Sequence, residues 1–305
     1  MCLSAVGTTM HPVTIENNAI RMEVWPQIGG KVSSIIDKSD QYELMFTYPA
    51  ELPDSPHYDA PYGDHWYAGW DECFPAVARS TYPRHPYNGI AVPDHGELWG
   101  IPTTTAVPTK DGITTVWHGL RFGYRLTRKL YLQDSAIVAE YDLTNLAPFE
   151  FRFVWALHGL LSMAQPVQLD VEQKRFRWSH DAEGKRYDTM FSWPMLGDNE
   201  DLSRPDSLPV KRGWKLFSVD PIQSAFVVSY PTRKRKLRME YESGDGMPAF
   251  WGVWINTGGS AGNRNFAVEP TTGQFDEIDR SIADDSAGQI GPFGHRNWLI
   301  RWTVS

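Results

Sequence analysis

Apolar residues recur at every second position of this chain, in short runs separated by turn-forming residues. In the run 136–144, four apolar residues fall on one face of an extended chain: Ile137, Ala139, Tyr141 and Leu143. Similar runs occupy segments 19–25, 32–37, 114–117, 124–132, 151–157, 224–230, 237–241, 250–256 and 298–304. We find no long segment with the 3.6-residue period of an amphipathic helix. Many short strands bounded by turns predict an all-β protein, a large antiparallel β-sandwich.

Two long segments, 48–93 and 181–209, lack this alternation and are rich in Pro, Gly and aromatic residues. Loops of this length inside a compact domain are usually functional or disordered. The first segment is too aromatic for disorder, because it contains Trp66, Tyr67, Trp70 and Phe74. We expect it to pack over one end of the sheets. No linker or short-period repeat divides the chain, so we expect residues 1–305 to form a single domain.

Charge and composition argue against several classes of function. The formal net charge of −8 is unfavourable for binding nucleic acid. No stretch is long and apolar enough to span a membrane, and the segment Met1–Gly7 lacks the features of a secretion signal. The two cysteines, Cys2 and Cys73, form no disulfide framework or metal-ligand pattern. We therefore expect a cytoplasmic protein with no nucleic-acid or membrane partner.

Two of the predicted strands end in a polar residue that shares a face with a small residue. His158 follows Ala156 by two positions and falls on the face opposite the bulky aromatic residues of its run. Glu269 follows Ala267 in the same way. The small neighbours leave room for a ligand beside each polar side chain. A histidine at a strand end is more often structural than functional, so these positions alone indicate candidates and not a reaction.

His158 and Glu269 each lie within a longer motif. The motifs VWALH at 154–158 and FAVEPTTG at 266–273 contain them. Six further motifs accompany these two: IRMEV at 20–24, GGKV at 29–32, GWDECFP at 69–75, DHGELWG at 94–100, DLTNLAPF at 142–149 and VWIN at 253–256. In order and spacing, the set resembles the aldose 1-epimerase (galactose mutarotase-like) family. The resemblance extends to residue 272 and implies that family's supersandwich fold.

The resemblance also implies a reaction, the interconversion of the α and β anomers of an aldose through opening of the sugar ring. By resemblance, Glu269 is the base that takes the proton of the anomeric hydroxyl, and His158 is the acid that protonates the ring oxygen. We expect the two to face each other across the bound sugar in one pocket. Further candidates for contacts to the sugar are His95, Asp71, Glu72, Arg79 and, as a stacking platform, Trp254.

Two departures from the family pattern bear on the substrate. Gly159 follows His158 where the family often has Pro. Leu98 and Trp99 stand where hexose-phosphate mutarotase-like members carry an Arg. The second departure favours a free sugar over a sugar phosphate as the small-molecule partner.

Alternative functions and sites remain open. The chain could be a non-catalytic carbohydrate-binding protein of the same fold. A glycoside hydrolase or lyase ranks last, because a hydrolase normally needs two carboxylates beside the glycosidic bond and one is assigned here. A polar loop cluster matches no compact zinc or calcium motif, so we expect no metal and no cofactor; it comprises His57, Asp59, Asp64 and His65. Both a monomer and a homodimer are compatible with the sequence.

Overall fold

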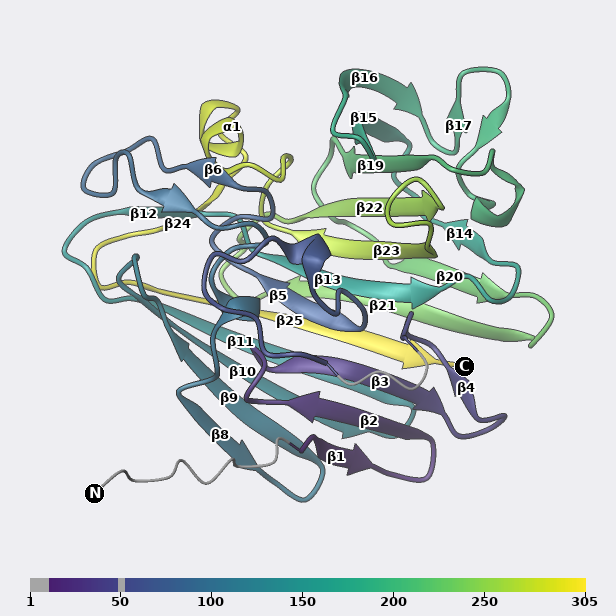
Figure 1. The fold of residues 1–305 in the computed structure, drawn as a ribbon, viewed down its shortest axis with the longest axis horizontal. Helices are drawn as coiled ribbons and strands as arrows, with labels where there is room; N and C mark the ends of the chain where they lie inside the picture. Colours follow the sequence, from purple (N-terminus) through teal and green to yellow (C-terminus); the bar gives the residue numbers. More distant parts are fainter. Residues whose placement is uncertain (1–10, 49–52) are drawn as a thin grey trace.

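Two antiparallel β-sheets make up most of the computed structural model, which describes residues 11–48 and 53–305 (Figure 1). Cys2 and the segment Met1–Gly7, on which the expectation about a secretion signal depends, lie outside the described residues. The all-β antiparallel sandwich predicted from the alternation is confirmed. No helix within the described ranges is long and apolar enough to cross a membrane.

The first sheet contains the strands that position the candidate site. It has 13 strands, in the spatial order β1 (Val13–Glu16), β2 (Ile20–Trp25), β3 (Lys31–Asp37), β5 (Trp70–Cys73), β13 (Ala156–Ser162), β23 (Arg264–Thr271), β22 (Phe250–Thr257), β19 (Gly213–Ser218), β15 (Arg175–Asp181), β16 (Arg186–Ser192), β17 (Met195–Leu196) and β18 (Glu200–Asp201), with β4 (Tyr42–Glu43) paired to β3. Figure 1 shows β5, β13, β23 and β22 side by side near the centre of this sheet.

The second sheet covers the inner face of the first. It has eight strands, in the order β14 (Gln168–Asp170), β20 (Phe226–Tyr230), β21 (Arg235–Ser243), β25 (His295–Val304), β11 (Ala136–Asn145), β10 (Tyr124–Gln133), β9 (Gly112–His118) and β8 (Thr105–Pro108). Two small two-stranded sheets pair β6 (Ser80–Thr81) with β7 (Ala91–Val92), and β12 (Phe151–Phe153) with β24 (Gly288–Ile290).

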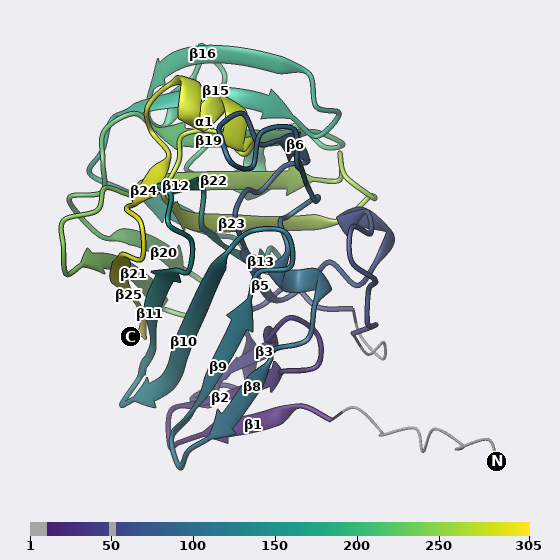
Figure 2. The same ribbon diagram turned by 90° about the vertical axis from the view of Figure 1, so that its left-hand side faces the viewer.

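The helices are short. The α-helix α1 (Ile278–Ala283) lies beside β6 at one end of the molecule (Figures 1 and 2). Single turns of 3₁₀ helix occur at η1 (Tyr62–Asp64), η2 (Leu98–Gly100) and η3 (Pro205–Ser207). The turn η1 belongs to the loops that cover the outer face of the first sheet.

Both segments expected to be loops contain strands, so that prediction was wrong in part. The segment 48–93 includes β5, a central strand of the first sheet, and the segment 181–209 includes β16, β17 and β18. Alternation does not reveal β5 because its two middle residues are the carboxylates Asp71 and Glu72, although all four residues of the strand are buried. Burial of charged residues as ion pairs removes the apolar signal on which the prediction depends.

The run 151–157, expected to be one strand, divides into β12 and β13, which belong to different sheets. The backbone leaves the strand at Val154 and Trp155. The Val154 amide donates to the Pro75 carbonyl at 2.8 Å, and the Trp155 amide donates to Thr272 Oγ1 at 2.8 Å. His158 is consequently the third residue of β13 and not the last residue of a strand.

A buried ion pair joins the two sheets inside the apolar core. Arg128 Nη1 on β10 lies 3.0 Å from Glu72 Oε1 on β5, and neither side chain is exposed to solvent. The Tyr141 hydroxyl donates to the same oxygen at 2.7 Å and Trp70 Nε1 at 3.0 Å, while Trp155 Nε1 donates to Oε2 at 2.8 Å. The carboxylate therefore has hydrogen bonds and a counter-charge in place of water, which its burial requires.

We predict that Arg128→Met destabilises the fold by about 3–5 kcal/mol, because it leaves the Glu72 charge buried without a partner. Urea denaturation followed by Trp fluorescence measures this loss. The matched control is Arg175→Met, which removes the exposed pair with Asp220 at 3.2 Å and should change the unfolding free energy by about 0–1 kcal/mol. Equal effects of the two substitutions would contradict a structural role for the buried pair.

Candidate functional site

A row of side chains from six neighbouring strands crosses the outer face of the first sheet. Antiparallel register pairs Asp71 of β5 with His158 of β13, and Lys215 of β19 with Trp254 of β22. Directly paired residues of an antiparallel sheet point to the same face. Further pairs connect the row through β23 and β15: Leu160 with Ala267, Trp254 with Ala267, and His180 with Lys215. Glu269 shares the face of Ala267, because it lies two positions further along β23.

Loops close over this row and leave a cavity of about 250 Å³. Its lining combines residues of the sheet with residues of five loops: Tyr62, Gly63, Tyr67, Val77, Ala78, Asp94, His95, His158, Leu160, His180, Lys215, Trp254, Ser260 and Asp276. The lining brings apolar and aromatic side chains together with converging histidines, carboxylates and a lysine, so polar groups that can orient a small molecule are present.

His158 lines this cavity, and Glu269 lies directly beside His158. His158 Nε2 is 3.9 Å from Glu269 Oε1, and the two side chains are 9% and 1% exposed. They project from adjacent strands, so the expectation that they face each other across a bound sugar was wrong. His158 lines the cavity, whereas Glu269 is not among the lining residues and lies directly behind His158 and Lys215, which both line it. Within the described residues, Glu269 Oε1 has no hydrogen-bond partner, so this oxygen is free to accept a proton or hydrogen bond from a ligand.

Burial and neighbouring charges favour the neutral form of His158. Burial lowers the pKa of the His158 imidazole well below its ordinary value, and the charges of His95, Lys215 and Lys31 lower it further. An imidazolium formed here would be a stronger acid than a histidine in water.

Lys215 binds two carboxylates at the base of the cavity. Its Nζ lies 2.6 Å from Glu269 Oε2 and 3.2 Å from Asp276 Oδ1. Burial acts to lower the pKa of Lys215, but the charges of Asp276 and Glu269 outweigh burial and raise it. Burial raises the pKa of Glu269, the charge of Lys215 opposes this, and Asp276 raises it further. The other oxygen of Asp276 lies 3.7 Å from His180 Nε2.

His95 enters the cavity from a loop with an unusual backbone. Its φ is 57° and that of Gly96 is 75°, both in the left-handed region that L-residues seldom adopt. At Gly96, a Cβ atom would lie 2.2 Å from the Phe74 carbonyl oxygen, so only glycine fits. The His95 ring stacks on Tyr62 with centroids 3.8 Å apart, and its Nδ1 lies 2.9 Å from Asp94 Oδ1. A strained backbone held by such contacts is typical of a functional position.

Asp71 supports the cavity from below without lining it. Its carboxylate binds the ammonium group of Lys31, and the Tyr62 hydroxyl donates to it at 2.8 Å. Asp71 is fully buried. It therefore helps to hold the ring of Tyr62, on which His95 stacks.

The remaining residues predicted to contact the sugar differ in whether they line the cavity. Trp254 lines the cavity. Glu72 does not, because alternation along β5 directs it into the core, where it pairs with Arg128. Arg79 lies outside the lining, where its Nη1 is 2.6 Å from Asp59 Oδ1 and its side chain is 49% exposed. Of the five substrate-contact candidates, His95 and Trp254 reach the cavity and Asp71 lies directly beneath it.

The polar loop cluster has other partners. His65 pairs with Asp54, and Asp59 with Arg79. The ring centroids of His57 and His65 are 6.2 Å apart. Within residues 11–48 and 53–305, no group of three or more His, Cys, Asp and Glu side chains is arranged to hold a metal ion.

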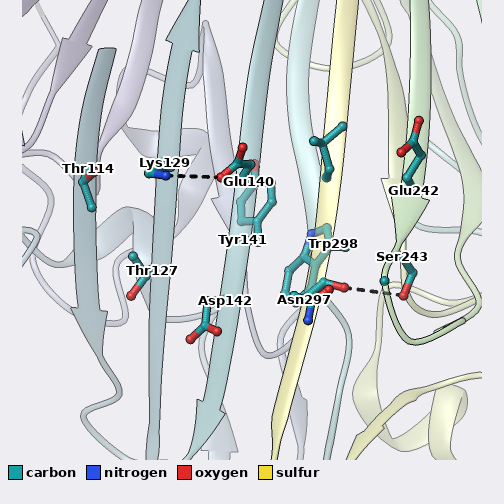
Figure 3. A pocket seen from close by; sticks show the side chains of 12 residues that line it. Thr114, Thr127, Lys129, Glu140, Tyr141, Asp142, Glu242, Ser243, Asn297 and Trp298 are labelled. Atoms are coloured by element: carbon teal, nitrogen blue, oxygen red, sulfur yellow. Dashed lines mark hydrogen bonds and ion pairs between the residues drawn. The ribbon is translucent and has the colours of Figure 1, made fainter. Parts of the chain in front are cut away.

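A larger hollow of about 550 Å³ lies on the second sheet (Figure 3). It is lined by residues of β9, β10, β11, β21 and β25, and Lys129 in it pairs with Glu140 at 3.5 Å. This hollow contains no histidine and none of the predicted site residues. Size alone therefore does not identify the candidate site, whereas the converging acid and base groups at His158 and Glu269 do.

Alternation did not single out Tyr62, His180, Lys215 or Asp276. Lys215 carried a signal, because it is a lone charge between Trp214 and Leu216 in an otherwise apolar strand. The other three became candidates when the tertiary structure brought their segments to the cavity.

No protein-family model matches this sequence, and no curated protein matches it. Solved structures share its fold over nearly the whole length. The Slr1438 protein of Synechocystis sp. PCC 6803 is 13% identical, with a TM-score of 0.72 over 100% of this chain and 99% of that protein. A galactose mutarotase-like protein of Lactobacillus casei is 14% identical, with a TM-score of 0.70 over 96% of this chain and 100% of that protein.

A galactose mutarotase related enzyme of Lactobacillus acidophilus is 13% identical, with a TM-score of 0.66 over 96% of this chain and 97% of that protein. Likeness at such low identity is evidence about the fold. The chain adopts the β-sandwich fold of galactose mutarotase-like proteins.

Proposed function

We propose that this protein is a mutarotase that interconverts the α and β anomers of a free aldose. The observation that carries the proposal is the pair formed by His158 and Glu269. Among the described residues, an unpartnered carboxylate oxygen of Glu269 lies 3.9 Å from an imidazole nitrogen of His158, which lines the cavity. The fold shared with galactose mutarotase-like proteins supports the same conclusion.

The proposed reaction needs one base and one acid near a single carbon. Glu269 Oε1 takes the proton of the anomeric hydroxyl while His158, in its protonated form, gives a proton to the ring oxygen. The bond between the anomeric carbon and the ring oxygen then breaks, and the aldehyde forms. After rotation about the adjacent carbon–carbon bond, the ring hydroxyl attacks the other face of the carbonyl, and both protons return. The two reacting oxygens share one carbon, so an acid and a base on neighbouring strands serve this chemistry.

The cavity suits one uncharged sugar ring. Its volume of about 250 Å³ is below the range of roughly 300–1,000 Å³ for drug-sized ligands, which favours a monosaccharide over an oligosaccharide. The ammonium groups of Lys31 and Lys215 are already bound to carboxylates. A phosphate would compete with Asp71, Glu269 and Asp276 for these cations, so the charges favour a neutral substrate.

The carboxylates also distinguish a mutarotase from a glycoside hydrolase. Glu269 and Asp276 bind the same ammonium group. The two carboxyl groups of a hydrolase flank the glycosidic bond with separate roles. The two carboxylates here share one counter-ion, which is unlike the separate acid and nucleophile of a hydrolase.

We predict that Glu269→Gln slows anomer exchange by about 10²-fold or more, since it keeps the shape of the side chain and removes the base. His158→Asn should act similarly, and the two losses should be strongly non-additive because both groups serve one step. Polarimetry or NMR exchange spectroscopy on a panel of free aldoses measures the rates, with sugar binding followed separately.

Arg79→Gln is the matched control, because Arg79 lies outside the cavity lining, and it should retain the wild-type rate. Sugar binding by a wild-type protein that exchanges anomers no faster than buffer would support the carbohydrate-binding alternative. Full activity of Glu269→Gln would place the base elsewhere.

We predict a bell-shaped pH profile with its maximum on the acid side of neutrality. The reaction needs Glu269 ionised and His158 protonated. Burial lowers the pKa of His158 below the ordinary value of about 6.5, so the acid is lost as the pH rises through that lowered pKa. The alkaline side of the kcat/KM profile should therefore begin to fall below about pH 6.5. A rate that increases steadily above neutral pH would contradict the assignment of His158 as the acid.

A further inference from the structure

Lys215 reaches Glu269 across an intervening strand. The lysine is on β19 and the glutamate on β23, with β22 between them. Gly252 of β22 is paired with Glu269 in the register. A Cβ atom at Gly252 would lie 3.3 Å from the Cβ of Glu269 and 3.6 Å from Oε2, in the space between the two strands. The absence of a side chain at position 252 therefore leaves room for the ion pair to cross the strand.

The contact with Lys215 gives the two carboxylate oxygens of Glu269 different surroundings. Oε2 lies 2.6 Å from Lys215 Nζ, whereas Oε1 faces His158 and has no hydrogen-bond partner among the described residues. The lysine side chain is 4% exposed, and Asp276 lies 3.2 Å from the same nitrogen. A buried ammonium held by two carboxylates has little freedom to move, so it restricts the rotation of Glu269 as well.

We propose that Lys215 is a positioning residue for Glu269, which holds Oε2 so that Oε1 is directed at the anomeric hydroxyl, and that Asp276 balances this contact from the other side. The inference rests on the proposed function in that Glu269 is taken as the base. Lys215 touches no reacting atom in this scheme. It acts by fixing the orientation and the charge of the carboxylate that does.

Five titratable groups surround the Glu269 carboxylate: Lys215 of β19, Asp276 after β23, His158 of β13, His95 of the loop before η2, and Cys73 of β5. The charge of Lys215 lowers the pKa of Glu269, and that of Asp276 raises it. Removal of either neighbour should therefore move the pKa of Glu269, in opposite directions. A residue that merely fills space would give no such pair of shifts.

The test is a ¹³C NMR titration of the Glu269 carboxyl carbon in the full-length protein. Lys215→Met should raise the pKa of Glu269, because burial and Asp276 then act without opposition. Asp276→Asn should lower the pKa of Glu269, because it removes the negative charge of Asp276 and leaves the ammonium of Lys215 paired with Glu269 alone. The control is Lys129→Met, which removes an exposed lysine paired with Glu140 on the second sheet and should leave the pKa of Glu269 unchanged.

The kinetic arm uses NMR anomer exchange with the same variants. Lys215→Met should lower kcat by about 10²-fold, the effect of misplacing a reacting group by about 1 Å, with little change in KM. Lys215→Arg keeps the charge and should recover part of this loss.

The outcomes separate the two proposals. An unchanged pKa of Glu269 in both Lys215→Met and Asp276→Asn would overturn the role of Lys215, whatever the activity. If Lys215→Met does not fold, Asp276→Asn decides, and a pKa that fails to fall overturns the proposal. If the two variants shift the pKa of Glu269 in opposite directions but the wild-type protein has no exchange activity, the contact is supported and the mutarotase function is rejected.

Discussion

The ion pair between Glu72 and Arg128 is the interaction on which the arrangement of the two sheets depends. It connects β5 of the first sheet to β10 of the second inside an apolar core, with both side chains fully buried. A lone charge at either position would destabilise the core, so a placement of the strands that separated Glu72 from Arg128 would be unfavourable. It also fixes the orientation of β5. With Glu72 directed inward, alternation directs Asp71 outward to the site.

The contacts of Asp71 connect β5 to the loops that cover the cavity. Asp71 binds Lys31 and accepts a hydrogen bond from the Tyr62 hydroxyl. The Tyr62 ring in turn stacks on His95, whose imidazole lies 5.1 Å from that of His158, centroid to centroid. Two adjacent residues of β5 thus have different roles: Glu72 stabilises the core, and Asp71 holds residues beside the cavity. A substitution that rotates β5 would disturb both.

The electrostatics of the cavity follow from burial and pairing. Lys215 is shared by Glu269 and Asp276, and His180 lies next to Asp276. Low solvent exposure strengthens these interactions and makes each charge sensitive to its neighbours. The same burial lowers the pKa of His158 and raises that of Glu269. Burial therefore disfavours the charged form of both groups, which makes His158 a stronger acid and Glu269 a stronger base than the same groups in water.

The alternation of apolar residues was sufficient to predict the fold class and many of the longer strands, because side-chain direction in a strand is a local property with a period of two. It did not predict β15 and β19, which carry His180 and Lys215. It also placed His158 and Glu269 on their strands, and the motifs around them indicated His95. Alternation could not reveal β5, whose charges are hidden in ion pairs, nor show which face of that strand is the core. Lys215 and Glu269 are 54 residues apart in the chain, and neither residue identifies the other. The pairing of β19, β22 and β23 decided their contact, because strand order in a sheet depends on long-range hydrogen bonding and packing that no local pattern encodes.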